Sequence, residues 1–383
     1  MKKKRLAILT EIIAPYRIPV FNALAKLDGI DLHVIFLAET DPDTRDWLVY
    51  KGEIRFSWEV LPSYRKRAGK HNFLLNVGVG AALRKANPDV IICGGYNYIA
   101  SWRALLWAGR NHLPFLLWTE SNSRDLRQNN PLTQRLKSTF IGRCDGFVVP
   151  GKASHQYLLS FNISREKIFT APNAVDNNLY KSIAAEVRSD AAKFRSQLDL
   201  PQRFFLFVGR MVSEKGIFDL LNAYAVLDLK LRAEVGLVFA GEGPERVKLE
   251  RLSQTVKVGS IRFSGFIQRE NLAQYYALAD ALVLPTHTDP WGLVVNEAMA
   301  CGLPIVCSEV AGCIPDLVEE GSNGFVIPAR NIKRLAQVLK ELASNPEIIR
   351  EMGENSRKRI LHFSPEICAS GIAEAAFSVK TKL

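Results

Sequence analysis

The stretch THTDPWGLVVNEAMACGLP, residues 286–304, carries the strongest indication of both fold and site. An apolar run at 281–285 precedes it and is typical of a buried strand, and Pro290 can occupy the first turn of a helix that reaches Ala300. Such a helix start leaves backbone N–H groups unpaired from Gly292 onward. Those donors and the positive end of the helix dipole favour an anion, and a diphosphate suits them well.

Two carboxylates, Asp289 and Glu297, lie eight residues apart around this junction. A carboxylate one or two turns into a helix that holds a diphosphate can accept hydrogen bonds from both ribose hydroxyls, as acidic residues do in dinucleotide sites. Asp289 would lie nearer to a transferred sugar, where it could stabilise developing positive charge. The alternative is structural: Asp289 is also a good helix N-cap, and Glu297 could be an exposed helix carboxylate.

Apolar strand-like runs alternate with helical patterns along the whole chain, which predicts an α/β fold with parallel sheets. At 383 residues the chain is too long for one ordinary core. We expect two Rossmann-like, doubly wound domains that face a cleft at the carboxyl ends of their strands. Their expected bounds are 1–180 and 200–362, with a polar link at 177–202 and a terminal helix at about 364–383 that can pack back on the first domain.

The expected strands follow the apolar runs. In the first half they are 5–10, 31–38, 56–61, 89–94, 115–119, 146–150 and 168–171. In the second half they are 203–208, 235–240, 261–266, 281–285, 304–308 and 324–327. Because parallel sheets bind ligands beyond the carboxyl ends of their strands, functional residues are expected in the turns that follow these runs.

Composition is that of a soluble globular protein, with 48% hydrophobic and 23% charged residues. No apolar run is long enough to span a membrane, and Glu11 and Pro15 interrupt the region that a signal peptide would keep apolar. The six cysteines form no Cys-x-x-Cys pair, so we expect buried free thiols and no metal site. The expected location is the cytoplasm, with contact at the inner face of the membrane left open.

Charge is uneven, since residues 1–180 hold 25 Lys and Arg against 15 Asp and Glu and so carry +10 of the net +11. Basic residues gather at 2–5 and at 65–70, and we expect the second group to lie in a loop beside Tyr64 and Phe73. A basic, partly aromatic loop suits an anionic membrane surface or an acidic acceptor. A plain solvated loop explains it as well. No recognition module supports nucleic-acid binding.

Arg210 and Lys215 follow the first strand of the second half. Two cations beside a helix start form a clamp that can offset the charge of a diphosphate leaving group. The structural alternative is that Lys215 pairs with Glu214 or Asp219 on the surface.

The next two strands end in less specific turns. Gly241 and Gly243 allow close backbone approach, with Pro244 at a helix start. Phe266 and Ile267 could receive a nucleobase. Both turns could equally be ordinary connections.

Taken together, these residues resemble the donor-binding domain of GT-B glycosyltransferases, in the large retaining group called family 4 or group 1. The matching stretches are VGR and EKG, the GEGP turn, SGF, YALAD and WGLVVNEAMACG, in the family's order between residues 200 and 330. The first half matches more loosely, through PYRIPVF after the first strand and PNAVD before the link.

The resemblance implies that Arg210 and Lys215 bind the donor diphosphate, that Glu297 binds the ribose, and that Asp289 contacts the donor sugar. The helix start at Gly292, Leu293 and Val294 would contribute backbone donors. It further implies a UDP- or GDP-sugar as co-substrate, no cofactor and no metal, and retention of anomeric configuration, with the departing phosphate helping to deprotonate the acceptor. The acceptor would be a glycan or a lipid-linked glycan.

The chain departs from the family pattern at two positions. Asp289 stands where the family usually has Glu, so its reach toward the sugar is one methylene shorter, and a Glu there is expected to preserve or raise turnover. Many relatives have a His after a central strand of the first domain, where this chain has Glu120, which becomes the candidate for polarising an acceptor hydroxyl.

Two other classes of protein compete with this interpretation. A non-catalytic relative that binds a membrane or a partner through its first half is favoured only by Asp289. A nicotinamide-dependent oxidoreductase would need Gly-x-Gly-x-x-Gly after a first strand, and the turn after Thr10 contains no glycine.

Overall fold

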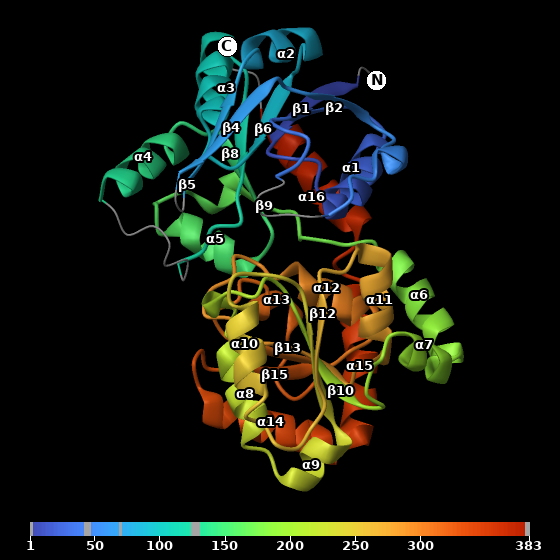
Figure 1. The fold of residues 1–383 in the computed structure, drawn as a ribbon. Helices are drawn as coiled ribbons and strands as arrows, with labels where there is room; N and C mark the ends of the chain where they lie inside the picture. The colour runs from blue at the N-terminus through green and yellow to red at the C-terminus, as the bar shows by residue number, and fades with distance from the viewer. Residues whose placement is uncertain (1–2, 42–46, 69–70, 124–130, 380–383) are drawn as a thin grey trace. The chain divides into compact units, whose positions relative to one another are not determined.

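The computed structural model describes residues 3–41, 47–68, 71–123 and 131–379, and the chain folds into two compact α/β units (Figure 1). The first unit comprises Met1–Val175 and Ser364–Leu383, and the second comprises Asp176–Phe363. Each is built on its own parallel sheet. The fold class expected from the alternation of strands and helices is therefore confirmed.

The first unit contains a parallel sheet of seven strands in the order β3-β2-β1-β6-β7-β8-β9. Their bounds are β1 Lys4–Thr10, β2 Ile30–Phe36, β3 Ser57–Val60, β6 Val90–Gly94, β7 Phe115–Trp118, β8 Gly146–Val149 and β9 Ile168–Thr170. Each lies within two residues of its expected bounds. The central strands β6, β7 and β8 were readily recognised because strands buried on both faces of a parallel sheet are continuous apolar runs.

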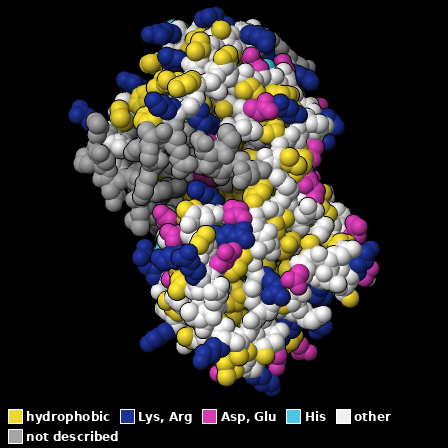
Figure 2. All heavy atoms as spheres, viewed as in Figure 1, with side chains coloured by type: hydrophobic (Ala, Val, Ile, Leu, Met, Phe, Trp, Pro, Cys, Tyr) yellow, Lys and Arg dark blue, Asp and Glu magenta, His cyan; other side chains and the backbone are white. Residues whose placement is uncertain are grey.

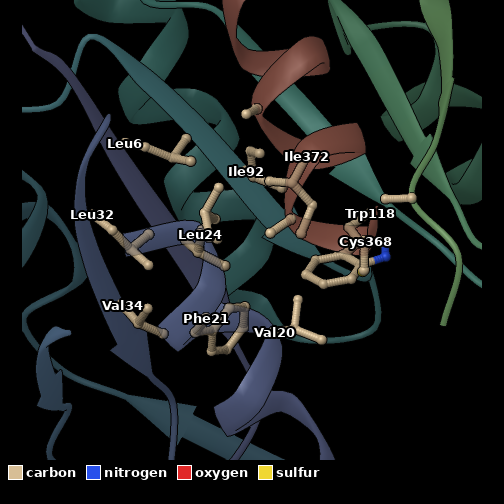
Figure 3. Close-up of a cluster of buried hydrophobic side chains, with 14 of the residues drawn as sticks. Leu6, Val20, Phe21, Leu24, Leu32, Val34, Ile92, Trp118, Cys368 and Ile372 are labelled. Carbon is tan, nitrogen blue, oxygen red and sulfur yellow. The ribbon is translucent and has the colours of Figure 1, made fainter. Parts of the chain in front are cut away.

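Helices cover both faces of this sheet. On one face, α1 (Ile18–Ala25) and α16 (Pro365–Ser378) pack on the core that Figure 3 shows, where Phe21, Trp118 and Ile372 converge. On the other face lie α2 Val79–Ala86, α3 Ile99–Arg110, α4 Pro131–Ile141 and α5 Lys152–Leu159. Short 3-10 turns, η1 Pro15–Arg17, η2 Lys51–Glu53 and η3 Arg165–Lys167, complete the unit.

The terminal helix α16 belongs to the first unit although it follows the second in sequence. Ser364 accepts a hydrogen bond from the Ile367 N–H at its start. Gly371 lets the helix approach the sheet closely, since a Cβ there would lie 2.2 Å from the Thr170 carbonyl oxygen. The chain therefore returns to its first unit through a small-residue contact.

The second unit contains a six-stranded parallel sheet in the order β12-β11-β10-β13-β14-β15. The strands are β10 Phe204–Val208, β11 Gly236–Ala240, β12 Ile261–Gly265, β13 Ala281–Leu284, β14 Ile305–Ser308 and β15 Gly324–Ile327, again within two residues of expectation. The helices are α6 Asn177–Ser189, α7 Ala191–Gln197, η4 Ser213–Lys215, α8 Ile217–Ala225, α9 Leu229–Glu234, α10 Arg246–Ser253, α11 Arg269–Leu278, α12 Leu293–Ala300, α13 Ile314–Leu317, α14 Ile332–Ser344 and α15 Pro346–Ile360.

Two segments differ from the sequence-based expectation. The supposed link at 177–202 forms α6 and α7 within the second unit. There the Tyr180 ring packs edge-on against the Tyr276 ring, with 6.3 Å between the ring centroids. The supposed basic loop is an antiparallel hairpin of β4 (Ser63–Ala68) and β5 (His71–Asn76). Lys2, Lys70 and the neighbouring Gly69 lie outside the described residues.

The six cysteines are buried and free, as expected. Burial raises the pKa of the Cys93 and Cys368 thiols to about 12, so both stay protonated and unreactive. Among the helices of the described ranges, none is long and apolar enough to cross a membrane.

Candidate functional site

The loops that follow β10, β11, β12 and β13 meet at the carboxyl edge of the second sheet, because all of its strands run parallel. Backbone hydrogen bonds join them: Met211 N–H donates to the Glu242 carbonyl at 2.8 Å, and Gly241 N–H donates to the Gly265 carbonyl at 2.7 Å. The turns singled out in the sequence therefore form one continuous surface of the second unit.

Gly241 and Gly243 allow the loops of this surface to pack closely against each other. A Cβ at Gly241 would lie 2.0 Å from the Gly209 carbonyl oxygen, and one at Gly243 would lie 2.4 Å from the Met211 carbonyl oxygen. The close approach expected at these glycines is thus made by the neighbouring loop that carries Arg210. Pro244 precedes α10, which begins at Arg246 and not at the proline.

The structure brings Lys215 and Asp289 together. Lys215 ends the 3-10 turn η4, and its Nζ lies 2.5 Å from Oδ2 of Asp289. Asp289 is nearly buried, and its other oxygen, Oδ1, accepts a bond from the Trp291 N–H at 3.3 Å. The structural alternative for Lys215, a surface pairing with Glu214 or Asp219, is therefore wrong, and Asp219 instead lies 2.7 Å from Nε2 of His287.

Hydrogen bonds hold the Lys215 loop against the loop that carries Asp289. His287 N–H donates to the Glu214 carbonyl at 2.8 Å, and the Thr286 hydroxyl donates to the same carbonyl at 3.1 Å. Gly216 sits in the left-handed region with φ 70°, at a point where a Cβ would lie 1.9 Å from the Pro285 carbonyl oxygen. The sequence Glu-Lys-Gly thus places a cation directly beside the loop that carries Asp289.

The helix α12 begins later than expected, at Leu293 and not at Pro290. Its N-cap is Gly292, whose φ of 95° is left-handed, and no side chain caps the helix start. Asp289 is consequently not the N-cap, and the structural alternative for this residue is wrong. The first-turn amides at Leu293 and Val294 lie directly after the loop that contains the Lys215–Asp289 pair.

Glu297 is partly buried on α12 and lies among tyrosines. The Tyr276 hydroxyl donates to Oε2 at 2.7 Å, and the Tyr180 hydroxyl also donates to the carboxylate. Burial raises the pKa of the Glu297 carboxyl, while these two bonds and the charge of Arg269 offset part of the rise. A carboxylate has about four acceptor positions, so two remain for a diol.

The tyrosines around Glu297 were not identified as site residues from the sequence. Tyr276 lies in the YALAD stretch, which offered a signal, whereas Tyr180 lies in the segment that was expected to be a link. Burial and the neighbouring Glu297 charge hold the pKa of both phenols well above the usual range. Both therefore remain hydrogen-bond donors to the carboxylate.

Arg210 and Phe266 are exposed on the same surface. The Arg210 side chain has no hydrogen-bond or ion-pair partner in the described part of the chain, so its guanidinium is available to a ligand. Phe266, directly after β12, leaves 41% of its surface exposed, and Ile267 beside it is half-buried. An exposed ring and an uncommitted guanidinium at one sheet edge suit a nucleobase and a phosphate, respectively.

Glu120 lies in the first unit, just after β7, and it is not a free carboxylate. A guanidinium nitrogen of Arg17 lies 2.6 Å from Oε1 of Glu120, and the Asn173 amide donates to the same oxygen at 3.0 Å. The Arg17 guanidinium also lies over the Trp118 ring at 4.0 Å. Glu120 is thus held as a fixed, ion-paired acceptor of hydrogen bonds. Arg17 and Asn173 were not predicted as site residues, although the matching stretches PYRIPVF and PNAVD that contain them offered a signal.

Comparison with known proteins matches both halves of the chain to glycosyltransferase families. The family model Glycos_transf_1, glycosyl transferases group 1, matches residues 189–359, and the model Glyco_transf_4, glycosyltransferase family 4, matches residues 20–179. An alpha-D-kanosaminyltransferase of Streptomyces kanamyceticus is 30% identical over 174 residues, covering 45% of each chain. A D-inositol 3-phosphate glycosyltransferase of Streptomyces bingchenggensis is 31% identical over 208 residues, covering 51% of this chain and 45% of the relative. These matches span about half the length of the curated relatives.

Solved structures agree over the whole fold. HepE of Anabaena in complex with UDP superposes with a TM-score of 0.76 at 19% identity, covering 99% of this chain and 100% of that one. Sucrose-phosphate synthase from Thermosynechococcus elongatus gives 0.72 at 22% identity, covering 97% and 98%. Two family models of one class match successive halves of a chain that has two parallel-sheet units, and the chain therefore belongs to the GT-B glycosyltransferases of family 4, the group 1 glycosyl transferases.

Proposed function

We propose that the protein transfers a hexose-type sugar from a UDP- or GDP-sugar to a glycan or lipid-linked glycan, with retention of anomeric configuration and without a metal. The observation that carries this proposal is the pairing of Lys215 with Asp289 next to the start of α12. A cation that would bind the diphosphate and a carboxylate that would bind the sugar thus lie side by side, which supports the proposal. The neighbour HepE has been solved with UDP and with UDP-glucose, which supports this donor class.

The proposed roles follow from the contacts. Lys215, Arg210 and the first-turn amides of α12 would offset the charge that develops on the departing diphosphate. Glu297, oriented by its tyrosines, would accept from the ribose hydroxyls. The Phe266 ring would lie against the base. The departing phosphate would accept the acceptor proton, so that Glu120, held by Arg17, would orient the acceptor and not deprotonate it.

The cellular location and the biosynthetic role of the reaction are also proposed. Six buried free thiols suit the reducing cytoplasm, and a sugar passed to a glycan or lipid-linked glycan there would serve the synthesis of an envelope polysaccharide or glycolipid.

A donor screen tests the proposal directly. The protein is incubated with UDP- and GDP-sugars and with candidate acceptors, with and without EDTA, and the anomeric configuration of the product is read by NMR. Transfer with a retained configuration that EDTA does not change is expected. An inverted product, or transfer that stops with EDTA, would contradict the mechanism.

A non-catalytic relative is the second candidate, and the Asp at 289 is the observation that favours it. Such a protein would bind no donor productively. Absence of turnover with every donor, together with membrane or partner binding that survives removal of both Arg210 and Lys215, would support it.

Replacing Asp289 with Glu tests whether the site fits the shorter acid. Because both Asp289 oxygens are engaged and the residue is nearly buried, an added methylene must displace the Lys215 contact. The geometry therefore reverses the expectation drawn from the family pattern, and we expect kcat to fall about tenfold, the cost of about 1.4 kcal/mol in the transition state. Steady-state kinetics measure this. Unchanged or faster turnover would show that Asp289 has room for the longer acid.

The raised pKa of Glu297 predicts a pH dependence of nucleotide binding. The ionised carboxylate accepts hydrogen bonds from a diol more strongly and at more positions than the protonated acid, so affinity should fall as the pH drops through this raised pKa. Titration calorimetry with UDP or GDP between about pH 5 and pH 8 measures this. Glu297→Gln should bind about tenfold more weakly at the upper end and lose the pH dependence. A wild-type affinity that is flat over this range would contradict the assignment.

A further inference from the structure

Most of the protein's positive charge comes from one segment. Residues 61–145 contain 13 Lys and Arg against four Asp and Glu, a net charge of +9 out of +11 for the chain. Its described part includes the hairpin β4–β5 and the helices α2, α3 and α4, which lie on the same side of the first sheet, whereas Lys70, Arg124 and Arg127 lie outside the described residues. The proposed donor site, in the second unit, uses none of these residues.

The hairpin exposes large apolar side chains together with a lysine. Tyr64 pairs with Leu75 and Lys66 pairs with Phe73 across the two strands, so all four side chains share one face. Tyr64, Leu75 and Phe73 expose 63%, 47% and 56% of their surface. An exposed patch of this kind marks an interaction site.

The opposite face of the hairpin is anchored to the first unit. Leu74 is buried there, and the Arg65 guanidinium lies 2.9 Å from Oδ1 of Asp41. Packing and an ion pair therefore hold the hairpin on the first unit by its inner face. The exposed apolar residues lie on its other face, which does not contribute to the core of the unit.

Helix α3 extends this surface. Its outer stripe consists of Ile99, Arg103, Leu106 and Arg110, at helical spacing, and its sequence IASWRALLWAGR contains no acidic residue. Arg103 joins the stripe to the hairpin by donating to the Asn76 carbonyl at 2.8 Å. Figure 1 places β4 and β5 beside α3, and Figure 2 shows Lys and Arg side chains interspersed with hydrophobic ones over α2 and α3.

The stripe ends at a hollow of about 620 Å³. Its cations are Arg110, Arg143 and Lys167, and Leu105, Leu106 and Leu113 supply apolar walls. The carboxylate in its lining, Asp145, accepts from the Phe115 N–H at 2.9 Å. A basic hollow with apolar walls suits an anionic headgroup with its attached chain.

We propose that this face, the outer side of the hairpin with the outer stripe of α3, is the surface by which the protein binds an anionic lipid bilayer. Large apolar side chains interspersed with cations match the boundary of a bilayer, where rings and aliphatic chains enter the interface and ammonium and guanidinium groups remain at the headgroups. A soluble polyanion would be bound by the cations alone. The proposal deepens the lipid-linked acceptor of the proposed function, but vesicle binding can be measured without turnover.

Vesicle sedimentation tests this proposal, with phosphatidylcholine vesicles that contain or lack phosphatidylglycerol. The wild-type protein should sediment with the anionic vesicles and not with the neutral ones. Lys66→Gln with Arg110→Gln should weaken binding about 25-fold, at about fivefold for each cation removed. Tyr64→Ser with Leu75→Ser should weaken it at least about tenfold.

Matched variants in the second unit serve as controls. Lys230→Gln with Lys257→Gln removes two exposed cations, and Leu229→Ser with Val247→Ser removes two exposed apolar side chains. Both should bind vesicles like the wild type. Nucleotide affinity and melting temperature should be unchanged in all four variants, which separates this proposal from the proposed function and from misfolding.

Three outcomes would overturn the proposal. The first is equal binding of the wild type to neutral and anionic vesicles. The second is an equal loss of binding in the control variants. The third is binding to dextran sulfate as tight as to anionic vesicles, with neither affected by Tyr64→Ser and Leu75→Ser, which would assign the face to a soluble polyanion.

Discussion

Replacing Lys215 with Met should lower kcat/KM for sugar transfer by about 10²–10³-fold, the usual cost of removing one donor from an oxyanion site. The Lys215 ammonium lies 2.5 Å from Asp289 and beside the start of α12, where the proposed diphosphate would develop its charge. Because that charge is largest in the transition state, kcat should fall more than the affinity for free UDP or GDP. Steady-state kinetics and calorimetry measure the two quantities separately.

Two controls separate catalysis from stability. Met at position 215 leaves the nearly buried Asp289 carboxylate without its ion pair, so the unfolding midpoint must be measured alongside. Lys230→Met removes an exposed lysine from the same unit and should change neither rate nor stability. Full turnover by Lys215→Met would exclude the assigned role, and a loss of rate explained by a loss of folded protein would leave the ion pair as a structural element only.

The sheets could be predicted from the sequence because their strands are buried on both faces. Runs such as FFLFV in β10 and ALVL in β13 consist of fully buried apolar residues, and no other element type fits four or five of these between turn signals. The hairpin β4–β5 was not predicted because its strands are not apolar runs. Its anchored face carries Arg65, paired with Asp41, so a charged residue stands where alternation would require an apolar one.

The candidate site was predictable residue by residue but not in its pairing. Lys215 and Asp289 are 74 positions apart and meet because β13 lies next to β10 in the sheet, an order that no local pattern encodes. Arg17 and Glu120, which are 103 positions apart, likewise meet because strand order brings together the segments that follow β1 and β7, although Arg17 itself was not predicted. Residue type indicates which interactions a side chain can make, whereas strand order determines which other residue it contacts.

Replacing Gly216 with Ala should destabilise the second unit by at least about 3 kcal/mol, a value in the upper range for single substitutions. A Cβ at this position would lie 1.9 Å from the Pro285 carbonyl oxygen and 2.7 Å from its carbonyl carbon, both backbone atoms that cannot rotate away. The left-handed φ of 70° adds strain. Urea unfolding of the variant and the wild type measures the difference.

Gly321→Ala is the matched control for this prediction. Gly321 has a similar φ of 76° in the same unit, but a Cβ there would meet nothing within 4 Å. Its substitution should therefore cost only the left-handed strain, about 1 kcal/mol. The difference between the two variants isolates the contact of the Lys215 loop with Pro285, and the folded fraction of Gly216→Ala should also bind nucleotide more weakly because that contact positions Lys215 beside Asp289. Equal costs for the two glycines would show that the two loops can separate without penalty, and the site would then not depend on their close approach.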